Sequence, residues 1–354
     1  MPYLGQYSIK ILDCLVGSVF QVVSASMVKS VPSTSHKQMV DLDASMLDLA
    51  AGRTPHGSFS ELLEAAKDHQ LASLLAYRCG PADSDALAYL KEAAVREMRL
   101  ASFQTSLIRH LAAVGVPAWP YKGPTLRALI NSPAPRESGD VDLLVQPEHI
   151  DKAYQTLLVG REPYGPGPDV RPIGLRRDAA MKDLENGHLI EIHWALAASC
   201  WRFTPERMVW DELESAGKPS NELLFSILAH HGVAHGFFRL KWLNDLVALS
   251  QSPSWSLPST LDVADQCGAR LAVDVSLVLM NQLLGFPLPS LKPSRRAIWI
   301  AELCGESIRR RMSDRHRYLQ LRVIHLMLVP DKIDLIRGII DGRRIKHLYP
   351  AEKR

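Results

Sequence analysis

The stretch Tyr121–Val145, YKGPTLRALINSPAPRESGDVDLLV, contains the pattern that decides the fold. It ends with Asp140 and Asp142, which flank Val141 and lead into three apolar residues typical of a buried strand. Because side chains alternate along a strand, both carboxylates point to the same face. Two neighbouring carboxylates repel each other unless a cation lies between them. Magnesium is the usual hard cation for such ligands and normally arrives with phosphates, so the stretch predicts metal-assisted chemistry on a nucleotide.

The Lys122–Gly123 step lies at a predicted turn from a strand to a helix. Residues 116–121 have the composition of a short strand, and Pro124 suits the first position of a helix, where no amide donor is needed. Free backbone amides, the positive end of a helix and a lysine together form a phosphate site. We therefore predict that Lys122 and Gly123 bind phosphate, although a lysine that points to solvent fits the sequence equally well.

A second pair of strands is predicted at residues 180–185 and 188–194. They are separated by Asn186–Gly187, and this dipeptide between two alternating runs is typical of a hairpin. In the second strand Glu191 and His193 share one face. His193 fits either a residue that lines the site or a hydrogen-bonded structural histidine.

Three segments in this order resemble the uncharacterised-nucleotidyltransferase family of the DNA polymerase β-like superfamily. The segments are Lys122–Gly123 with Arg136 and GDVDLLV at 139–145, GHLIEIHW at 187–194, and residues 231–249. Residues 45–250 carry the resemblance. It implies an α+β fold, in which a small mixed sheet of the polymerase β-like nucleotidyltransferase type is embedded between N-terminal and C-terminal helical regions.

The resemblance also assigns the site. Asp140, Asp142 and Glu191 would be both the catalytic residues and the ligands of two Mg²⁺ ions, with Glu191 as the third carboxylate. A nucleoside triphosphate would be the donor, and ATP is the expected one. The predicted nucleotide-binding residues are Lys122, Gly123, Arg136, Arg239 and Lys241.

Structural interpretations compete with several of these assignments. Arg136 equally fits an ion pair that holds its loop, and Arg239 with Asp245 fits a buried polar pair that fixes the helices. His231 and His235 have the HxxxH spacing, which can bind zinc. The residues between them are Gly, Val and Ala, so the glutamate of HExxH is absent and a metalloprotease is excluded.

The expected reaction is Mg²⁺-dependent transfer of a nucleoside monophosphate to an acceptor that the sequence does not identify. A small molecule, a peptide, a protein side chain and RNA all stay open, and some relatives are encoded beside genes for lasso peptides. Two alternatives are a non-catalytic nucleotide-binding scaffold and a nucleotidyltransferase or toxin that modifies RNA. The net charge of +3 argues mildly against nucleic acid as a partner.

Composition and length are those of an ordinary globular protein, with 354 residues, 47% apolar and 22% charged. The five scattered cysteines form no CxxC pair, which excludes zinc-ribbon and thioredoxin-like sites and favours the reducing cytoplasm. No apolar run is long enough to span a bilayer, so no membrane partner is expected. A signal peptide at 11–27 is disfavoured because Asp13 and Gln21 interrupt the run.

The predicted organisation has four parts. Residues 1–42 form an N-terminal arm and linker, 43–113 a helical region, 114–200 the nucleotidyltransferase core, and 201–354 a C-terminal helical domain. The Gly-, Pro- and Arg-rich segment 160–178 is predicted to be a connector. The arginine-rich segment after residue 294 fits a charged helix surface or a site for an acidic partner.

Overall fold

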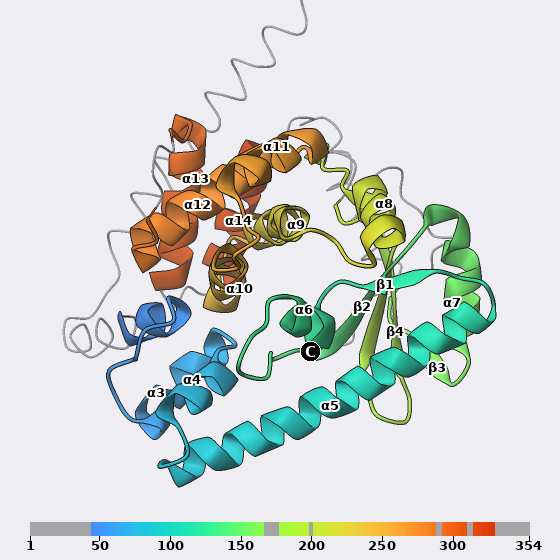
Figure 1. Ribbon diagram of the computed structural model, residues 1–354, viewed down its shortest axis with the longest axis horizontal. Helices are drawn as coiled ribbons and strands as arrows, with labels where there is room; N and C mark the ends of the chain where they lie inside the picture. The colour runs from blue at the N-terminus through green and yellow to red at the C-terminus, as the bar shows by residue number, and fades with distance from the viewer. Residues whose placement is uncertain (1–43, 166–176, 198–200, 288–291, 310–313, 330–354) are drawn as a thin grey trace, which may run out of the picture. The chain divides into compact units, whose positions relative to one another are not determined.

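The computed structural model describes residues 44–165, 177–197, 201–287, 292–309 and 314–329 (Figure 1). These residues belong to one compact unit that spans 44–354. The predicted arm at 1–42, the middle of the predicted connector and the basic residues beyond 329 lie outside the described residues. The fold class is α+β, as predicted, and helices make up most of it.

The helices before the sheet begin where polar side chains cap them. Ser58 and Glu61 form a reciprocal capping box at the start of the first full helix, and the Asp83 carboxylate accepts from two backbone amides at the start of the longest one. The longest helix ends at Ala113, the last residue of the helical region predicted at 43–113. These helices are α3 (Phe59–Asp68), α4 (Ala72–Cys79) and α5 (Ser84–Ala113).

The five strands found in the described residues form one mixed sheet in the order β1-β2-β5-β4-β3. β2 and β5 are parallel neighbours, whereas the other three pairs are antiparallel. The predicted hairpin is present as β4 and β5, and the predicted strand at 116–121 is shorter. The strands are β1 (Ala118–Pro120), β2 (Asp140–Val145), β3 (Arg161–Pro163), β4 (Asp178–Asp183) and β5 (Leu189–His193).

One part of the predicted connector is wrong, because Arg161–Pro163 forms the edge strand β3. Only three residues long, it has no alternating apolar pattern that would reveal a strand. It pairs with β4 in register Arg161 with Asp183, and the two side chains form an ion pair of 3.1 Å between Nε and Oδ2. Pairing with a neighbouring strand, not local sequence, therefore makes this segment a strand.

The two faces of β2 have different surroundings. Val141, Leu143 and Val145 belong to a core cluster with apolar residues of α5, of β5 and of α7 (Ile150–Leu158), which follows the short 3-10 helix η1 (Pro147–His149). Strand alternation turns Asp140 and Asp142 to the opposite face. The apolar cluster that holds β2 in place therefore leaves the two carboxylates on the other face. There Lys122, the N-cap of α6 (Gly123–Leu129), binds Asp142.

A second group of helices follows the sheet (Figure 1). α9 is its centre, because it packs against α10, α11, α12 and α14. None of the helices in the described residues is both long and apolar enough to cross a bilayer. The group consists of α8 (Glu206–Ala216), α9 (Asn221–Ala234), α10 (Leu240–Ser250), α11 (Leu257–Cys267), α12 (Arg270–Leu284), α13 (Arg295–Arg309) and α14 (Asp314–Leu328).

Gly232 allows the chain to turn tightly at the end of α9. A Cβ atom at this position would lie 2.3 Å from Cζ of Phe237, a fully buried ring. We expect Gly232→Ala to lower the free energy of unfolding by about 1–3 kcal/mol, because the ring must shift in a packed core. Chemical denaturation measures the change.

Gly305 in α13 is the matched control. A Cβ there would meet Leu279 Cδ2 at 3.8 Å, an ordinary contact. Gly305→Ala should therefore stabilise the protein by about 0.5–1 kcal/mol, through the better helix propensity of alanine. Equal changes in the free energy of unfolding for the two substitutions would show that the clash with Phe237 does not lower stability.

Candidate functional site

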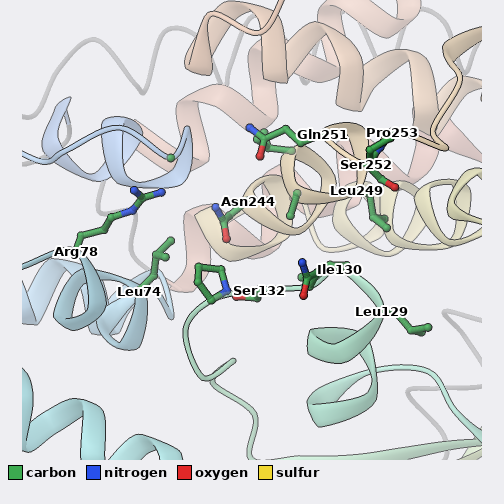
Figure 2. A pocket seen from close by; sticks show the side chains of 15 residues that line it. Leu74, Arg78, Leu129, Ile130, Ser132, Asn244, Leu249, Gln251, Ser252 and Pro253 are labelled. Atoms are coloured by element: carbon green, nitrogen blue, oxygen red, sulfur yellow. The ribbon is translucent and has the colours of Figure 1, made fainter. Parts of the chain in front are cut away.

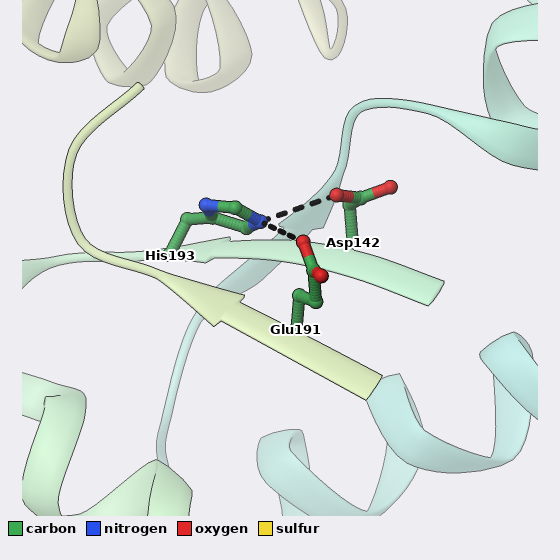
Figure 3. A group of neighbouring side chains, drawn as sticks. All are labelled: Asp142, Glu191 and His193. Carbon is green, nitrogen blue, oxygen red and sulfur yellow. Dashed lines mark hydrogen bonds and ion pairs between the residues drawn. The ribbon is translucent and has the colours of Figure 1, made fainter. Parts of the chain in front are cut away.

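The register of two parallel strands brings the acidic residues together. β2 pairs with β5 so that Asp142 lies opposite Glu191, and Leu144 lies opposite His193. Asp142, Glu191 and His193 therefore project from neighbouring strands toward one point (Figure 3). Their ligand atoms all lie within 4.8 Å of one another. Asp140, at the first position of β2, lies on the same face two residues earlier.

Asp142 is the centre of the site. Its carboxylate is buried, and Oδ1 accepts a hydrogen bond of 2.8 Å from Nζ of Lys122. The Nε2 atom of His193 lies 3.1 Å from the same oxygen and 3.4 Å from Oε2 of Glu191. The second oxygen, Oδ2, is shielded from solvent and has no hydrogen-bond partner in the part of the chain that the structure describes.

The charges of this group shift one another's protonation. Burial alone would raise the pKa of Asp142, but Lys122 and the hydrogen bond from His193 outweigh it and hold that pKa far below its usual range. Burial would likewise lower the pKa of Lys122, and the Asp142 carboxylate raises it instead. Burial and then Asp142 raise the pKa of Asp140. Asp142 and Lys122 are therefore a charged pair at neutral pH.

Tyr121 contacts two residues of the site, a role that no sequence pattern indicates. Its buried ring lies edge-on to the His193 ring at 5.4 Å between centroids. Nζ of Lys122 lies 4.9 Å from the centre of the same ring, a cation–π distance. Burial raises the pKa of the Tyr121 hydroxyl, so the residue stays neutral. It packs between the two residues that bind Asp142 and so fixes both.

The donor set fits a hard divalent cation. Two carboxylates on facing strands are the oxygen ligands that Mg²⁺ prefers, and imidazole adds a ligand better suited to Mn²⁺ or other transition metals. The buried Oδ2 of Asp142 has no donor among the described residues, so one oxygen of this carboxylate lacks the partner that a cation would supply. Among the described residues, Asp142, Glu191 and His193 are the only group of this kind. Asp140 is not part of it, and its ligand role stays a prediction.

The Lys122–Gly123 step has the predicted local conformation. Lys122 is the N-cap of α6, Gly123 has φ +60°, and Pro124 follows in the first turn. A Cβ on Gly123 would lie 3.7 Å from Oγ of Ser138 and 3.8 Å from the carbonyl oxygen of Asp140. The step therefore lies against the strand that carries the carboxylates, while phosphate binding by Gly123 stays a prediction.

Arg136 is bound to Asp245 in a buried ion pair. The guanidinium spans the carboxylate, with Nη2–Oδ2 at 2.9 Å and Nε–Oδ1 at 3.2 Å, and Nη1 donates to Oγ of Ser138. The interpretation of Asp245 as a member of a buried polar pair fits the structure, but the partner of its carboxylate is Arg136 of the 131–139 loop. The structure thus gives Arg136 the structural partner that the sequence left open, and a phosphate contact stays a prediction.

Lys241 and Arg239 lie at the start of α10. Nζ of Lys241 donates to the carbonyl oxygen of Glu137 at 3.2 Å, beside the Arg136–Asp245 pair. Burial and then Arg136 lower the pKa of Lys241 to about 7. Arg239 is the N-cap of α10, and its guanidinium carbon lies 5.0 Å from the centre of the Phe238 ring. Their nucleotide contacts stay predictions.

The two histidines of the HxxxH spacing do share a face. The rings of His231 and His235 lie 4.5 Å apart, and both contact the ring of Trp242 at 5.5 Å. Burial, followed by the positive charge of Arg177, lowers the pKa of His235 to about 3, so its imidazole is neutral. The metal-ligand group found in the described residues includes neither histidine, so a zinc site at this pair has no support there.

A cavity of about 300 Å³, shown in Figure 2, has no carboxylate among the residues that line it. Leu74 and Arg78 of α4, Ile130 and Ser132 beyond the end of α6, and Asn244 of α10 line it. Lys122 is at the opposite end of α6, and seven helical residues span roughly 10 Å. This cavity is therefore not part of the acidic site.

Comparison with known proteins gives one match. Neither the curated proteins nor the solved structures contain a significant relative of this chain. A family model described as uncharacterised nucleotidyltransferase matches residues 55–285. The matched segment contains β2, β5 and every residue of the acidic site. By this match over more than half of its length, the chain belongs to the uncharacterised nucleotidyltransferase family.

Proposed function

We propose that the protein is a Mg²⁺-dependent nucleotidyltransferase that transfers a nucleoside monophosphate from a nucleoside triphosphate to an acceptor. The observation that carries the proposal is the pairing of Asp142 with Glu191 across two parallel strands, with Lys122 on the same carboxylate. Membership of a nucleotidyltransferase family supports the same reaction class. ATP is the donor we expect.

In the proposed reaction the acceptor oxygen forms a bond to the α-phosphorus. The bond from that phosphorus to the bridging oxygen breaks, its electron pair leaves with pyrophosphate, and the acceptor's proton passes to solvent. Asp140, Asp142 and Glu191 would hold Mg²⁺, which when bound neutralises phosphate charge and activates the acceptor oxygen. The ammonium group of Lys122, which donates a hydrogen bond to Asp142, would donate to a phosphate oxygen instead when the nucleotide binds.

The first experiment is a titration of the purified protein with each of the four ribonucleoside triphosphates, with and without Mg²⁺. We expect Mg²⁺-dependent binding of at least one nucleotide, followed by release of pyrophosphate when an acceptor is supplied. Binding that is indifferent to Mg²⁺, or no binding at all, would contradict the proposal.

A non-catalytic nucleotide-binding scaffold is the second candidate. One observation favours it: Oδ1 of Asp142 is already bound to Lys122 and His193, which together take the place of a cation. A scaffold of this kind would bind nucleotide without Mg²⁺ and would not release pyrophosphate with any acceptor. The titration therefore separates the two candidates.

We include a cytoplasmic location in the proposal, which the buried free thiols of Cys267 and Cys304 support.

The protonation of Lys241 gives nucleotide binding a pH dependence. With a pKa of about 7, Lys241 is charged below that pH and mostly neutral above it. A bound phosphate would raise this pKa, so we expect nucleotide binding near pH 8 to take up close to one proton, and affinity to fall as the pH rises through about 7. Calorimetry in buffers of different ionisation enthalpy measures the uptake.

Lys241→Met should remove this proton uptake. The matched control is Lys67→Met, because Lys67 is an exposed lysine of α3 that pairs only with Glu64 at the surface. The control should take up the same number of protons as the wild type. Equal uptake by Lys241→Met and the wild type would mean that Lys241 does not sense the nucleotide.

A further inference from the structure

The charge of Lys122 acts on all three carboxylates that are predicted to bind metal. Its ammonium donates to Oδ1 of Asp142 at 2.8 Å. Burial and then Asp142 raise the pKa of Asp140, and the charge of Lys122 is the strongest effect that opposes them. Burial lowers the pKa of Lys122 itself, but Asp142 and, more weakly, Glu191 raise it well above its usual value. One lysine therefore serves as the counter-ion of the whole acidic group.

Lys241 is a second lysine whose charge reaches this group, and its influence is smaller. It lowers the pKa of Asp140 less than Lys122 does. Its ammonium donates to the carbonyl oxygen of Glu137 at 3.2 Å, and with a pKa of about 7 it is only partly charged at neutral pH. Lys122 is charged and binds Asp142 directly, so its position dominates the charge balance of the site.

The two groups bound to Oδ1 of Asp142 differ in what they can offer a metal ion. Nε2 of His193, at 3.1 Å, can itself become a ligand, because a neutral imidazole has a lone pair. The ammonium of Lys122 has three donors and no lone pair, so it can only repel the ion. Lys122 is therefore a competitor of the metal and not a ligand.

The repulsion between the two cations is large at the distances of this site. Mg²⁺ binds carboxylate oxygens at about 2.1 Å, so an ion on Oδ1 would lie within about 5 Å of Nζ while Lys122 keeps its bond of 2.8 Å. At that separation the repulsion exceeds the thermal energy by about a factor of ten, even with an effective dielectric constant of about 20. Lys122 in this position therefore weakens the binding of a divalent ion.

Asp142 cannot replace Lys122 by water. Only 1% of its side-chain surface is exposed, and a buried charge without a partner is strongly unfavourable. Lys122 keeps 17% of its side-chain surface exposed, so a ligand from solvent can reach its ammonium. A ligand that draws Lys122 away thus leaves Asp142 with the need for another cation, and a divalent ion is the one that the neighbouring Glu191 and His193 can also bind.

We infer that Lys122 is a built-in counter-ion that keeps the metal site at low affinity until a nucleoside triphosphate draws it away, so that the divalent ion and the nucleotide bind cooperatively. The inference rests on the proposed function and adds the regulation of its site. Because coupling between two ligands is reciprocal, each strengthens the binding of the other. Removing the charge of Lys122 should therefore strengthen metal binding to the protein alone and weaken nucleotide binding.

The first measurement is Mn²⁺ binding to the protein without nucleotide, followed by electron paramagnetic resonance at neutral pH. We expect Lys122→Met to bind Mn²⁺ about tenfold more tightly than the wild type, a typical coupling between two sites. Lys122→Gln also removes the charge but keeps a donor for Asp142, and it gives the same test if Lys122→Met does not fold.

Two control variants separate the charge at this position from other effects. Lys122→Arg keeps the positive charge and should bind Mn²⁺ as weakly as the wild type. Lys67→Met removes a positive charge from the exposed surface of α3 and should also behave as the wild type.

The second measurement adds a non-hydrolysable analogue of the triphosphate that the wild type binds. The analogue should tighten Mn²⁺ binding to the wild type about tenfold or more, and this enhancement should be about tenfold smaller in the two uncharged variants. A titration without protein corrects for the Mn²⁺ that the analogue binds itself.

Three results would overturn the inference. They are equal or weaker Mn²⁺ binding by the uncharged variants without nucleotide, tight binding by Lys122→Arg, and an analogue that leaves the Mn²⁺ affinity of the wild type unchanged. The third result requires no variant. A wild type that binds no triphosphate would overturn the proposed function instead, and the comparison of the proteins without nucleotide would not depend on it.

Discussion

Asp142→Asn is expected to reduce nucleotidyl transfer by about a thousandfold or more. The substitution keeps the shape of the side chain but removes the charge that Lys122, His193 and a divalent ion would share. Metal-ion stabilisation of phosphate charge is worth several kcal/mol in such reactions, and each 1.36 kcal/mol is a factor of ten in rate. Rates with the wild-type donor and a saturating acceptor measure the loss.

Metal binding is the second measurement, because it does not depend on knowing the acceptor. Mn²⁺ bound to the protein, detected by electron paramagnetic resonance, should decrease in Asp142→Asn. Asp183→Asn is the matched control. Asp183 is a buried carboxylate of the same sheet, ion-paired with Arg161 but outside the acidic group. Its loss should lower stability and leave Mn²⁺ binding intact. Full Mn²⁺ binding by Asp142→Asn would contradict the assignment.

Arg136→Met is expected to destabilise the protein by about 3–5 kcal/mol. Arg136 and Asp245 are almost fully buried and form a forked pair, so the substitution leaves the Asp245 charge without its partner in a site with little solvent. The pair joins the loop before Asp140 to α10, and its loss loosens the strand that holds the carboxylates. Urea unfolding of the variant measures the change.

The double variant Arg136→Met/Asp245→Leu separates a structural role from a phosphate contact. If Arg136 only fixes the loop, removing both charges should recover most of the lost stability, because two apolar side chains replace the pair, and should restore nucleotide affinity with it. If Arg136 also contacts phosphate, stability returns but affinity does not. If the single variant Arg136→Met were as stable as the wild type, the ion pair of Arg136 with Asp245 would not contribute to stability.

The strand pattern of the acidic site could be predicted because it is local. Asp140-Val141-Asp142 followed by an apolar run specifies which side chains share a face, and Asn186–Gly187 specifies a hairpin whose second strand carries Glu191. Both follow from period-two alternation within a few residues. The family resemblance through the same residues agrees with the family match, and the α+β class follows from it.

Partners distant in sequence could not be predicted, because pairing over a long separation depends on how helices and sheet pack. Asp245 binds Arg136, 109 residues away, whereas the sequence suggested the nearby Arg239 as its partner. His193 joins the carboxylates because parallel pairing puts it next to Asp142, 51 residues earlier. Sequence spacing placed it near Glu191 and left its role open.

The sequence by itself indicated the reaction class to expect, since local alternation puts Asp140 and Asp142 on one face of a strand, and the family resemblance added Glu191 as the predicted third carboxylate. The tertiary structure decided which groups neutralise them. It placed Lys122 on Asp142 and gave Arg136 a buried partner. It also formed a cavity of about 280 Å³ from three segments that are distant in sequence. Burial and charge balance depend on all surrounding chain segments at once, and no local pattern records them.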